Sequence, residues 1–280
     1  MPAVHLERAT LGGIKLEYEV RGAGEPVVLI HAGVCADWFR PMMDEPALAR
    51  RYRLVRYHRA GYAGSGRVAG PLDVAGNAAH CLALLRHLGI ERAHVVGHSS
   101  SATIALQVAL DFPDAAHTVV SMEAARPIPS TELQAEFIRT YIQPAMQCYR
   151  AGDRAGAVDT FFRGVFGDGY GPALEEGLPG AFDQAVAEAD AFFGQELPAL
   201  QQWEFTGTTR AAPPSRCCSC SARSRRRPSP SGASCCSRGC RTPSRSISPT
   251  FGTSCTSSAL RPSPRRLPGS SHDTRSPERC

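Results

Sequence analysis

The chain has 280 residues and a formal net charge of +5, which hides two opposite parts. Residues 1–206 carry 17 basic and 24 acidic side chains, a net charge of −7, whereas residues 207–280 carry 14 arginines and two acidic side chains, a net charge of +12. No apolar run approaches 18 residues, and the first seven residues lack the basic and apolar parts of a signal peptide. We therefore expect no membrane-spanning helix and predict a cytoplasmic protein.

The first 126 residues alternate between predicted strands and predicted helices. A hairpin is expected around Gly12-Gly13, because glycine readily adopts the positive φ of a tight turn. The run 26–31 is continuously apolar, as in a strand covered on both faces. Further strands are predicted at 52–57, 93–96 and 117–122, and helices at 72–88 and 102–110. This alternation predicts an α/β domain over residues 1–126 with a mostly parallel sheet.

Residues 127–205 have no strand pattern. Helical spacing of apolar residues is found at 131–150, 154–165 and 180–203, with aromatic side chains on the apolar faces. One interpretation is that these helices simply pack on the sheet or on one another. A second, compatible with the first, is a helical lid whose apolar face lines a substrate pocket. We predict a cap over residues 127–205.

The strongest chemical signal is the segment Gly97-His98-Ser99-Ser100-Ser101, between a predicted buried strand and a predicted helix. Small residues at positions 97 and 101 permit the sharp turn that lifts the Ser99 hydroxyl above the sheet. The helix directs its N-terminus at this hydroxyl, so the N–H of Ser100 can donate to a developing oxyanion. Ser99 is therefore the predicted nucleophile, and His98 is expected to pack or orient rather than to act as the base.

This segment and two others resemble the α/β-hydrolase superfamily, in its lidded, esterase-like branch. His31-Ala32-Gly33 is similar to the family's oxyanion loop, with Ala32 in place of the usual glycine. The resemblance implies that the N–H of Gly33, or of Val34, is the second oxyanion donor. Residues 57–65 are similar to the family's Asp-x-Arg-Gly-x-Gly-x-Ser loop, with departures at Tyr57 and Ala60.

The resemblance covers residues 1–206 and implies an α/β-hydrolase fold and a serine hydrolase of ester or related acyl bonds. The expected partner is a small ester-like molecule, with no cofactor, no metal ion, no membrane and no specific nucleic acid. A serine at the nucleophile position argues against haloalkane dehalogenases and epoxide hydrolases, whose relatives use aspartate there.

The family places its triad acid after the seventh strand and its histidine after the eighth. Residues 207–280 contain three Leu or Ile, no Val, Met, Trp or Tyr, and eight of the 11 cysteines, so little apolar area offsets backbone ordering. We predict a disordered or poorly packed tail over 206–280 that replaces the last two strands and leaves the strand at 117–122 as an exposed edge. The remaining candidates for base and acid are His272 and Glu123, and we expect catalysis to be impaired.

A shift of reading frame explains the composition of the tail. Residues 215–222 are compatible with codons that, read one nucleotide earlier, spell Gln-Pro-Val-Leu-Leu-Val-Leu-Gly, a buried strand. Residues 250–257 and 264–274 similarly permit a histidine-containing loop and a terminal helix. Three family elements in one frame and in the right order indicate a frameshift near residues 206–207.

Other interpretations of the tail stay open. Its cysteines lack the paired Cys-x₂-Cys spacing of zinc sites, and the basic run 223–227 can attract nucleic acid through charge alone. The alternative function is therefore a non-catalytic small-molecule-binding protein with a basic tail to which nucleic acid adheres.

Overall fold

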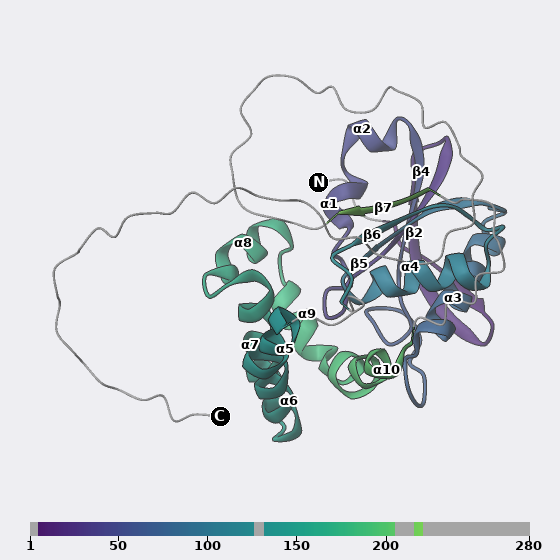
Figure 1. Ribbon diagram of the computed structural model, residues 1–280. Helices are drawn as coiled ribbons and strands as arrows, with labels where there is room; N and C mark the ends of the chain where they lie inside the picture. The colour runs from purple at the N-terminus through teal and green to yellow at the C-terminus, as the bar shows by residue number, and fades with distance from the viewer. Residues whose placement is uncertain (1–4, 126–131, 205–215, 221–280) are drawn as a thin grey trace, which may run out of the picture. The chain divides into compact units, whose positions relative to one another are not determined.

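The computed structural model describes residues 5–125, 132–204 and 216–220. Within them, the strands form one sheet (Figure 1). Its seven strands follow the order β1-β2-β4-β3-β5-β6-β7. β1 and β2 are antiparallel to their neighbours, and β4, β3, β5, β6 and β7 are mutually parallel. The strands are β1 (Glu7–Leu11), β2 (Ile14–Arg21), β3 (Glu25–Ile30), β4 (Tyr52–His58), β5 (Ala93–His98), β6 (Ala116–Met122) and β7 (Arg216–Cys220). The mostly parallel sheet predicted from the sequence is confirmed.

Alternate residues of the central strands face opposite layers, as the two-residue period of a strand requires. Val28 and Val95 pack with the apolar faces of α3 (Val74–His87) and α4 (Ser100–Asp111), which lie together against one face of the sheet (Figure 1). Leu29 packs in a second cluster with residues of two short helices, α1 (Arg40–Met43) and α2 (Pro46–Ala49). Both faces of the sheet are therefore covered, which explains the continuous apolar run at 26–31.

The helices between strands begin and end where the sequence provides caps. Asp73 accepts a hydrogen bond from the N–H of Gly76 at the start of α3, and Gly89 follows its end with a φ of +67°. In the cap, Asp153 accepts from the N–H of Gly156 at the start of α7. These side chains satisfy N–H groups that have no partner within the helix.

The region 132–202 is helical throughout. Its elements are α5 (Glu132–Phe137), η1 (Ile138–Ile142), α6 (Gln143–Arg150), α7 (Arg154–Phe166), α8 (Tyr170–Gly177), α9 (Ala181–Ala187), η2 (Asp190–Glu196) and α10 (Leu197–Gln202), where η marks a π-helix. The cap has its own apolar core, which contains Phe162 and Phe193 together with Val34 and Cys35 of the predicted oxyanion loop. Cap and sheet domain therefore share a packed boundary at this loop.

Among the described residues, no helix is both long and apolar enough to cross a bilayer.

One expectation about the C-terminal part was wrong. β7 pairs in parallel with β6, with Val119 opposite Cys217 and Ser121 opposite Ser219, so β6 is not an exposed edge. The composition of the tail misled the prediction because the hydrogen bonds of a sheet join backbone groups, and an apolar edge strand is a template for a neighbour of almost any sequence. The remainder of the predicted tail lies outside the described residues, as does His272.

Candidate active site

Ser99 occupies a strained turn between the end of β5 and the start of α4. Its φ is +56° and its ψ is −121°, a backbone conformation that residues other than glycine rarely adopt. A Cβ atom on Gly97 would clash with the backbone carbonyl of Ser101, so only glycine permits the chain to turn so closely. Ser99 is half-buried, and among the described residues its hydroxyl has no hydrogen-bond partner. This is the backbone conformation of a sharp strand-to-helix turn, the context in which the sequence predicted a nucleophile.

His31, at the end of β3, joins the elbow to the two neighbouring loops. The hydroxyl of Ser101 donates to the backbone oxygen of His31 at 2.5 Å, and the N–H of Arg59 donates to Nε2 of His31 at 3.0 Å. Nε2 must therefore accept, so Nδ1 carries the proton and donates to the backbone oxygen of Ala32 at 2.7 Å. Burial, together with the charge of Arg59, lowers the pKa of His31 well below its usual value. A neutral His31 thus holds the oxyanion loop and the loop after β4 in fixed register with the elbow.

In the predicted oxyanion loop, the residue with a strained backbone conformation is Val34. Val34 has a φ of +63°, which is unusual for a β-branched residue, whereas Ala32 does not adopt a positive φ and is therefore compatible with the site. A Cβ atom on Gly33 would clash with the ring of Phe192 from η2, so the cap packs directly on this residue. Ser100, the first residue of α4, lies at a helix terminus where N–H groups lack intrahelical partners. The loop at Gly33 and the start of α4, which carry the two predicted donors, are thus joined through the hydrogen bond between Ser101 and His31.

Glu123, the predicted acid, follows β6 and has a φ of +46°. Its carboxylate lies 3.3 Å from Nε2 of His98, which stacks on Trp38 with ring centroids 4.8 Å apart and planes at 7°. Trp38 stacks in turn on Phe166 of the cap. The partner of Glu123 in the described structure is therefore the histidine inside the elbow, which packs as the sequence predicted. The predicted base, His272, is not in the described part of the chain.

The sequence family described as the alpha/beta hydrolase fold matches residues 25–156, from β3 through the elbow and into the cap. Over these residues the chain matches the α/β-hydrolase family, and its fold is that of an α/β-hydrolase. The fold expected from the resemblance in the sequence is thereby confirmed.

Three relatives illustrate how far the likeness extends. The chain is 36% identical over 104 residues to the protein named carbamate hydrolase RutD of Azorhizobium caulinodans, covering 37% of this chain and 38% of that protein. It is 30% identical over 187 residues to the fluoroacetate dehalogenase of Burkholderia sp, covering 59% and 60%. The crystal structure of the enol-lactonase from Burkholderia xenovorans LB400 superposes with a TM-score of 0.54 at 20% identity, covering 68% and 75%. The chain thus spans less than two thirds of the length of both curated relatives. Its likeness to the lactonase is a likeness of fold alone.

A buried polar cluster beside the oxyanion loop was not predicted as part of the site. The guanidinium of Arg59 is fully buried and donates from Nη2 to Oε2 of Glu196 at 2.8 Å, and the hydroxyl of Tyr62 donates to the same oxygen. The other oxygen of Glu196 has no partner and would lie 3.4 Å from a Cβ atom on Gly33. The motif at 57–65 identified Arg59, but nothing in the sequence could indicate that Glu196, 137 residues later, is its partner.

A second acid of the cap, Glu188, also reaches the loop after β4. Its carboxylate accepts from the N–H of Ala63 at 2.6 Å, and burial raises the pKa of Glu188 to about 7. The backbone donor and the charges of His58 and Arg67 oppose this increase without cancelling it. Cap and loop are therefore joined by a carboxyl group whose protonation changes near neutral pH.

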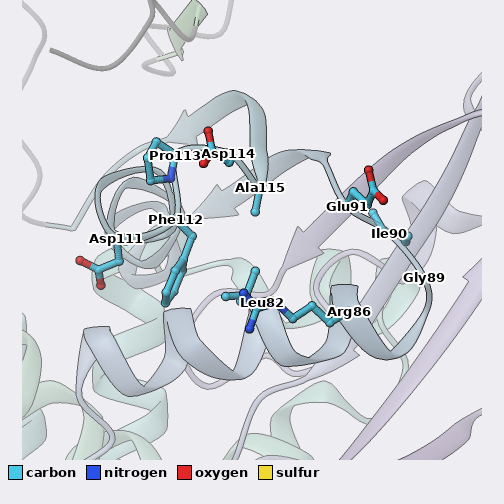
Figure 2. Close-up of a pocket in the computed structure, with 10 residues that line it drawn as sticks. All are labelled: Leu82, Arg86, Gly89, Ile90, Glu91, Asp111, Phe112, Pro113, Asp114 and Ala115. Carbon is cyan, nitrogen blue, oxygen red and sulfur yellow. The ribbon is translucent and has the colours of Figure 1, made fainter. Parts of the chain in front are cut away.

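Two surface pockets of the described structure lie away from Ser99. The one in Figure 2, of about 530 Å³, is lined by residues at the ends of α3 and α4, including Arg86, Asp111 and Phe112. It is separated from Ser99 by the full length of α4, roughly 18 Å at 1.5 Å per residue. The other, of about 580 Å³, is lined by residues of the loop after β4 and of the cap, including Arg67 and Tyr149. Neither contains an element of the elbow or of the oxyanion loop.

Proposed function

We propose that this protein hydrolyses a small-molecule ester or a related acyl bond, with Ser99 as the nucleophile. The observation that carries the proposal is the Ser99 turn: a φ of +56° places a half-buried, unpartnered hydroxyl at the start of α4, within the described structure. The N–H groups of Ser100 and Gly33 would stabilise the negative charge that develops on the acyl oxygen. A serine, rather than a carboxylate, at this position favours acyl chemistry over displacement of a halide.

The surroundings of the elbow favour a substrate with a compact apolar portion. Trp38 stacks between His98 and Phe166, and Phe192 packs against Gly33. Aromatic side chains from the cap and from the oxyanion loop would thus form the walls beside the reacting carbonyl. Carbamates, named for RutD, and lactones, named for the solved neighbour, both present such a carbonyl, so they belong to the class that should be assayed first.

We further propose that turnover by this chain is slow. Triad catalysis needs an imidazole that accepts the proton of the serine, and His272 is the one histidine that follows His117 in the sequence. Glu123, the alternative acid, has His98 as its partner. Loss of triad members reduces turnover by about 10⁴–10⁶-fold, so residual activity should be close to background.

The frameshift remains a proposal. β7 falls within residues 215–222, the segment that spells an apolar strand in the other frame. An apolar strand at this position would also be the pairing partner that β6 accepts. Sequencing the gene across codons 200–220 tests the idea, and a frame that continues without insertion or deletion relative to intact relatives would contradict it.

The buried thiols support a reducing location. Cys35 and Cys81 are free and buried, and burial raises the pKa of Cys35 to about 12. Such thiols are unreactive and typical of proteins from reducing compartments. We therefore keep the cytoplasm as the proposed location.

A fluorophosphonate probe and p-nitrophenyl acetate test the nucleophile. We expect slow covalent labelling that Ser99→Ala abolishes and Ser121→Ala, which removes a buried hydroxyl from β6, retains, with esterase turnover near background. Efficient turnover lost in Ser99→Ala would overturn the proposed impairment. Absence of labelling in a folded wild-type protein would overturn the nucleophile and leave small-molecule binding as the function.

A further inference from the structure

Three side chains of metal-binding type meet at the N-terminal ends of three adjacent strands, at the opposite end of the sheet from Ser99. Glu25 is the first residue of β3, His94 the second of β5 and His117 the second of β6, and these strands are neighbours in the sheet. His94 precedes Ser99 by five residues along β5, roughly 16 Å at 3.3 Å per residue. The cluster is therefore separate from the proposed hydrolytic site.

The spacing of the donor atoms suits a metal ion. Oε1 of Glu25 lies 3.2 Å from Nε2 of His94 and 3.3 Å from Nε2 of His117, and the three donor atoms all lie within 4.8 Å of one another. Zinc bonds of about 2.1 Å in tetrahedral geometry place ligand atoms about 3.4 Å apart. Two of the three separations match this value, and the third, between the two imidazole nitrogens, is at most 4.8 Å.

A bulge in β6 brings His117 to the face that carries His94. The register of β5 and β6 shifts at this point, because Ala93 pairs with Ala116 whereas His94 pairs with Thr118. Ala116 and Val119 both pack in the cluster on the α3 and α4 side, although residues three apart in a regular strand face opposite ways. The extra residue is His117. Bulges re-aim side chains in this manner at functional positions.

The surroundings of His94 leave Nε2 of its imidazole available to bind a cation. Nδ1 of His94 lies 2.7 Å from the hydroxyl oxygen of Thr118, which can accept a hydrogen bond from a protonated Nδ1. Nε2 is buried and has no hydrogen-bond partner, because its 3.2 Å approach to Glu25 lacks hydrogen-bond geometry. When Nδ1 holds the proton, the lone pair of Nε2 faces a carboxylate oxygen, and a cation between the two removes the repulsion. Outer partners such as Thr118 fix the orientation of metal-binding histidines in this way.

We propose that Glu25, His94 and His117 bind one divalent metal ion of the zinc class. Two imidazoles and one carboxylate are a ligand set that borderline ions such as Zn²⁺ and Co²⁺ accept, whereas Mg²⁺ and Ca²⁺ prefer oxygen ligands alone. The side chains of His117 and Glu25 are 44% and 52% exposed, so at least one coordination position faces water. The ion would link the first residues of three parallel strands. Because it would bind the folded state and not the unfolded chain, it would increase the free energy of unfolding.

The competing explanation is a carboxylate paired with two protonated histidines. Such a cluster would need no metal and would bind none. A second competitor is the group of eight cysteines in residues 207–280, which can bind zinc as thiolates without any contribution from the sheet. The experiment has to separate the three cases.

Zn²⁺ and Co²⁺ titrations of the full chain, free of affinity tag, provide that separation. Binding is followed by calorimetry with Zn²⁺, and by the absorption spectrum with Co²⁺, because thiolate ligands give an intense charge-transfer band and imidazole and carboxylate ligands do not. The variants are Glu25→Gln, His117→Ala and Thr118→Val, and the matched control is His5→Ala, which removes an exposed histidine outside the cluster.

We expect one equivalent of metal whose affinity falls at least 100-fold in Glu25→Gln and in His117→Ala, by about 10–100-fold in Thr118→Val, and not at all in His5→Ala. Far-ultraviolet circular dichroism and thermal unfolding without metal show that each variant is folded. Added Zn²⁺ should raise the melting temperature of the wild type and of His5→Ala equally, and that of the three cluster variants by less. Identical titrations of all proteins, or cobalt spectra that contain only thiolate bands, would overturn the proposed site.

Discussion

The same three strands, β3, β5 and β6, carry chemically different groups at their two ends. At the C-terminal ends lie His31, Ser99 and Glu123, and the turns there adopt positive φ at Val34, Ser99 and Glu123. At the N-terminal ends lie Glu25, His94 and His117, placed by a bulge and by side-chain geometry without positive φ. Among the non-glycine residues of these strands and of the turns beside them, positive φ is thus confined to the C-terminal ends, where Ser99 and the predicted N–H donors lie.

The cap accounts for a second difference between the two ends. Glu188 and Glu196 reach from the cap to the loop after β4, and Phe192 covers Gly33, so the C-terminal end is a buried polar and aromatic layer. The N-terminal cluster is at least partly exposed at each of its three side chains. Changes at the first end should therefore cost folding free energy as well as reactivity, whereas changes at the second should alter metal binding and leave the fold intact.

Gly97→Ala should have the largest effect. The new Cβ atom meets backbone atoms of Ser101, which cannot move without displacing α4, so we expect a loss of at least about 4 kcal/mol in the free energy of unfolding. This corresponds to a fall of at least about 8 °C in melting temperature and to loss of labelling at Ser99. Gly169→Ala is the control, because a Cβ atom there meets nothing within 4 Å. Equal melting temperatures for the two variants would show that the turn is not as tight as described.

Glu196→Gln should follow. It leaves the fully buried Arg59 without its carboxylate, and removal of one partner of a buried ion pair costs about 3 kcal/mol. Urea unfolding of Glu196→Leu, Arg59→Leu and the double variant measures the coupling, and the double variant should lose less than the sum of the two single variants. Strict additivity would indicate that cap and loop are not joined through this pair.

Glu188→Gln should have a smaller effect that depends on pH. Burial raises the pKa of Glu188 to about 7 from an ordinary value of 4.5, so the folded state holds a proton that the unfolded state has lost. This group therefore decreases stability progressively as the pH rises from about 4.5 to 7, by about 3 kcal/mol in total, and adds no further change above that range. Unfolding of wild type and variant at pH 5 and pH 8 should show a stability difference that shifts in favour of the variant at pH 8. A pH-independent difference would contradict the raised pKa.

Much of the fold follows from local signals in the sequence. Gly12-Gly13 marks the first hairpin, the apolar runs mark β3 and β5, and the helical pattern at 154–165 corresponds to α7, which ends at Phe166. The prediction of the tail was wrong at β7, because backbone pairing to an existing strand does not require the side chains that a composition argument expects.

The candidate site divides in the same way. The sequence by itself determined the sharp turn at Gly97 and Ser99, because a strand-to-helix turn constrains residues that lie close together in the chain. Only the tertiary structure decided that Glu196 pairs with Arg59, that Glu123 pairs with His98 and that Glu25, His94 and His117 converge. These partners are 23 to 137 residues apart, and no local pattern encodes them. Sheet register, a single bulge and the docking of the cap bring them together, and each of these depends on long-range packing.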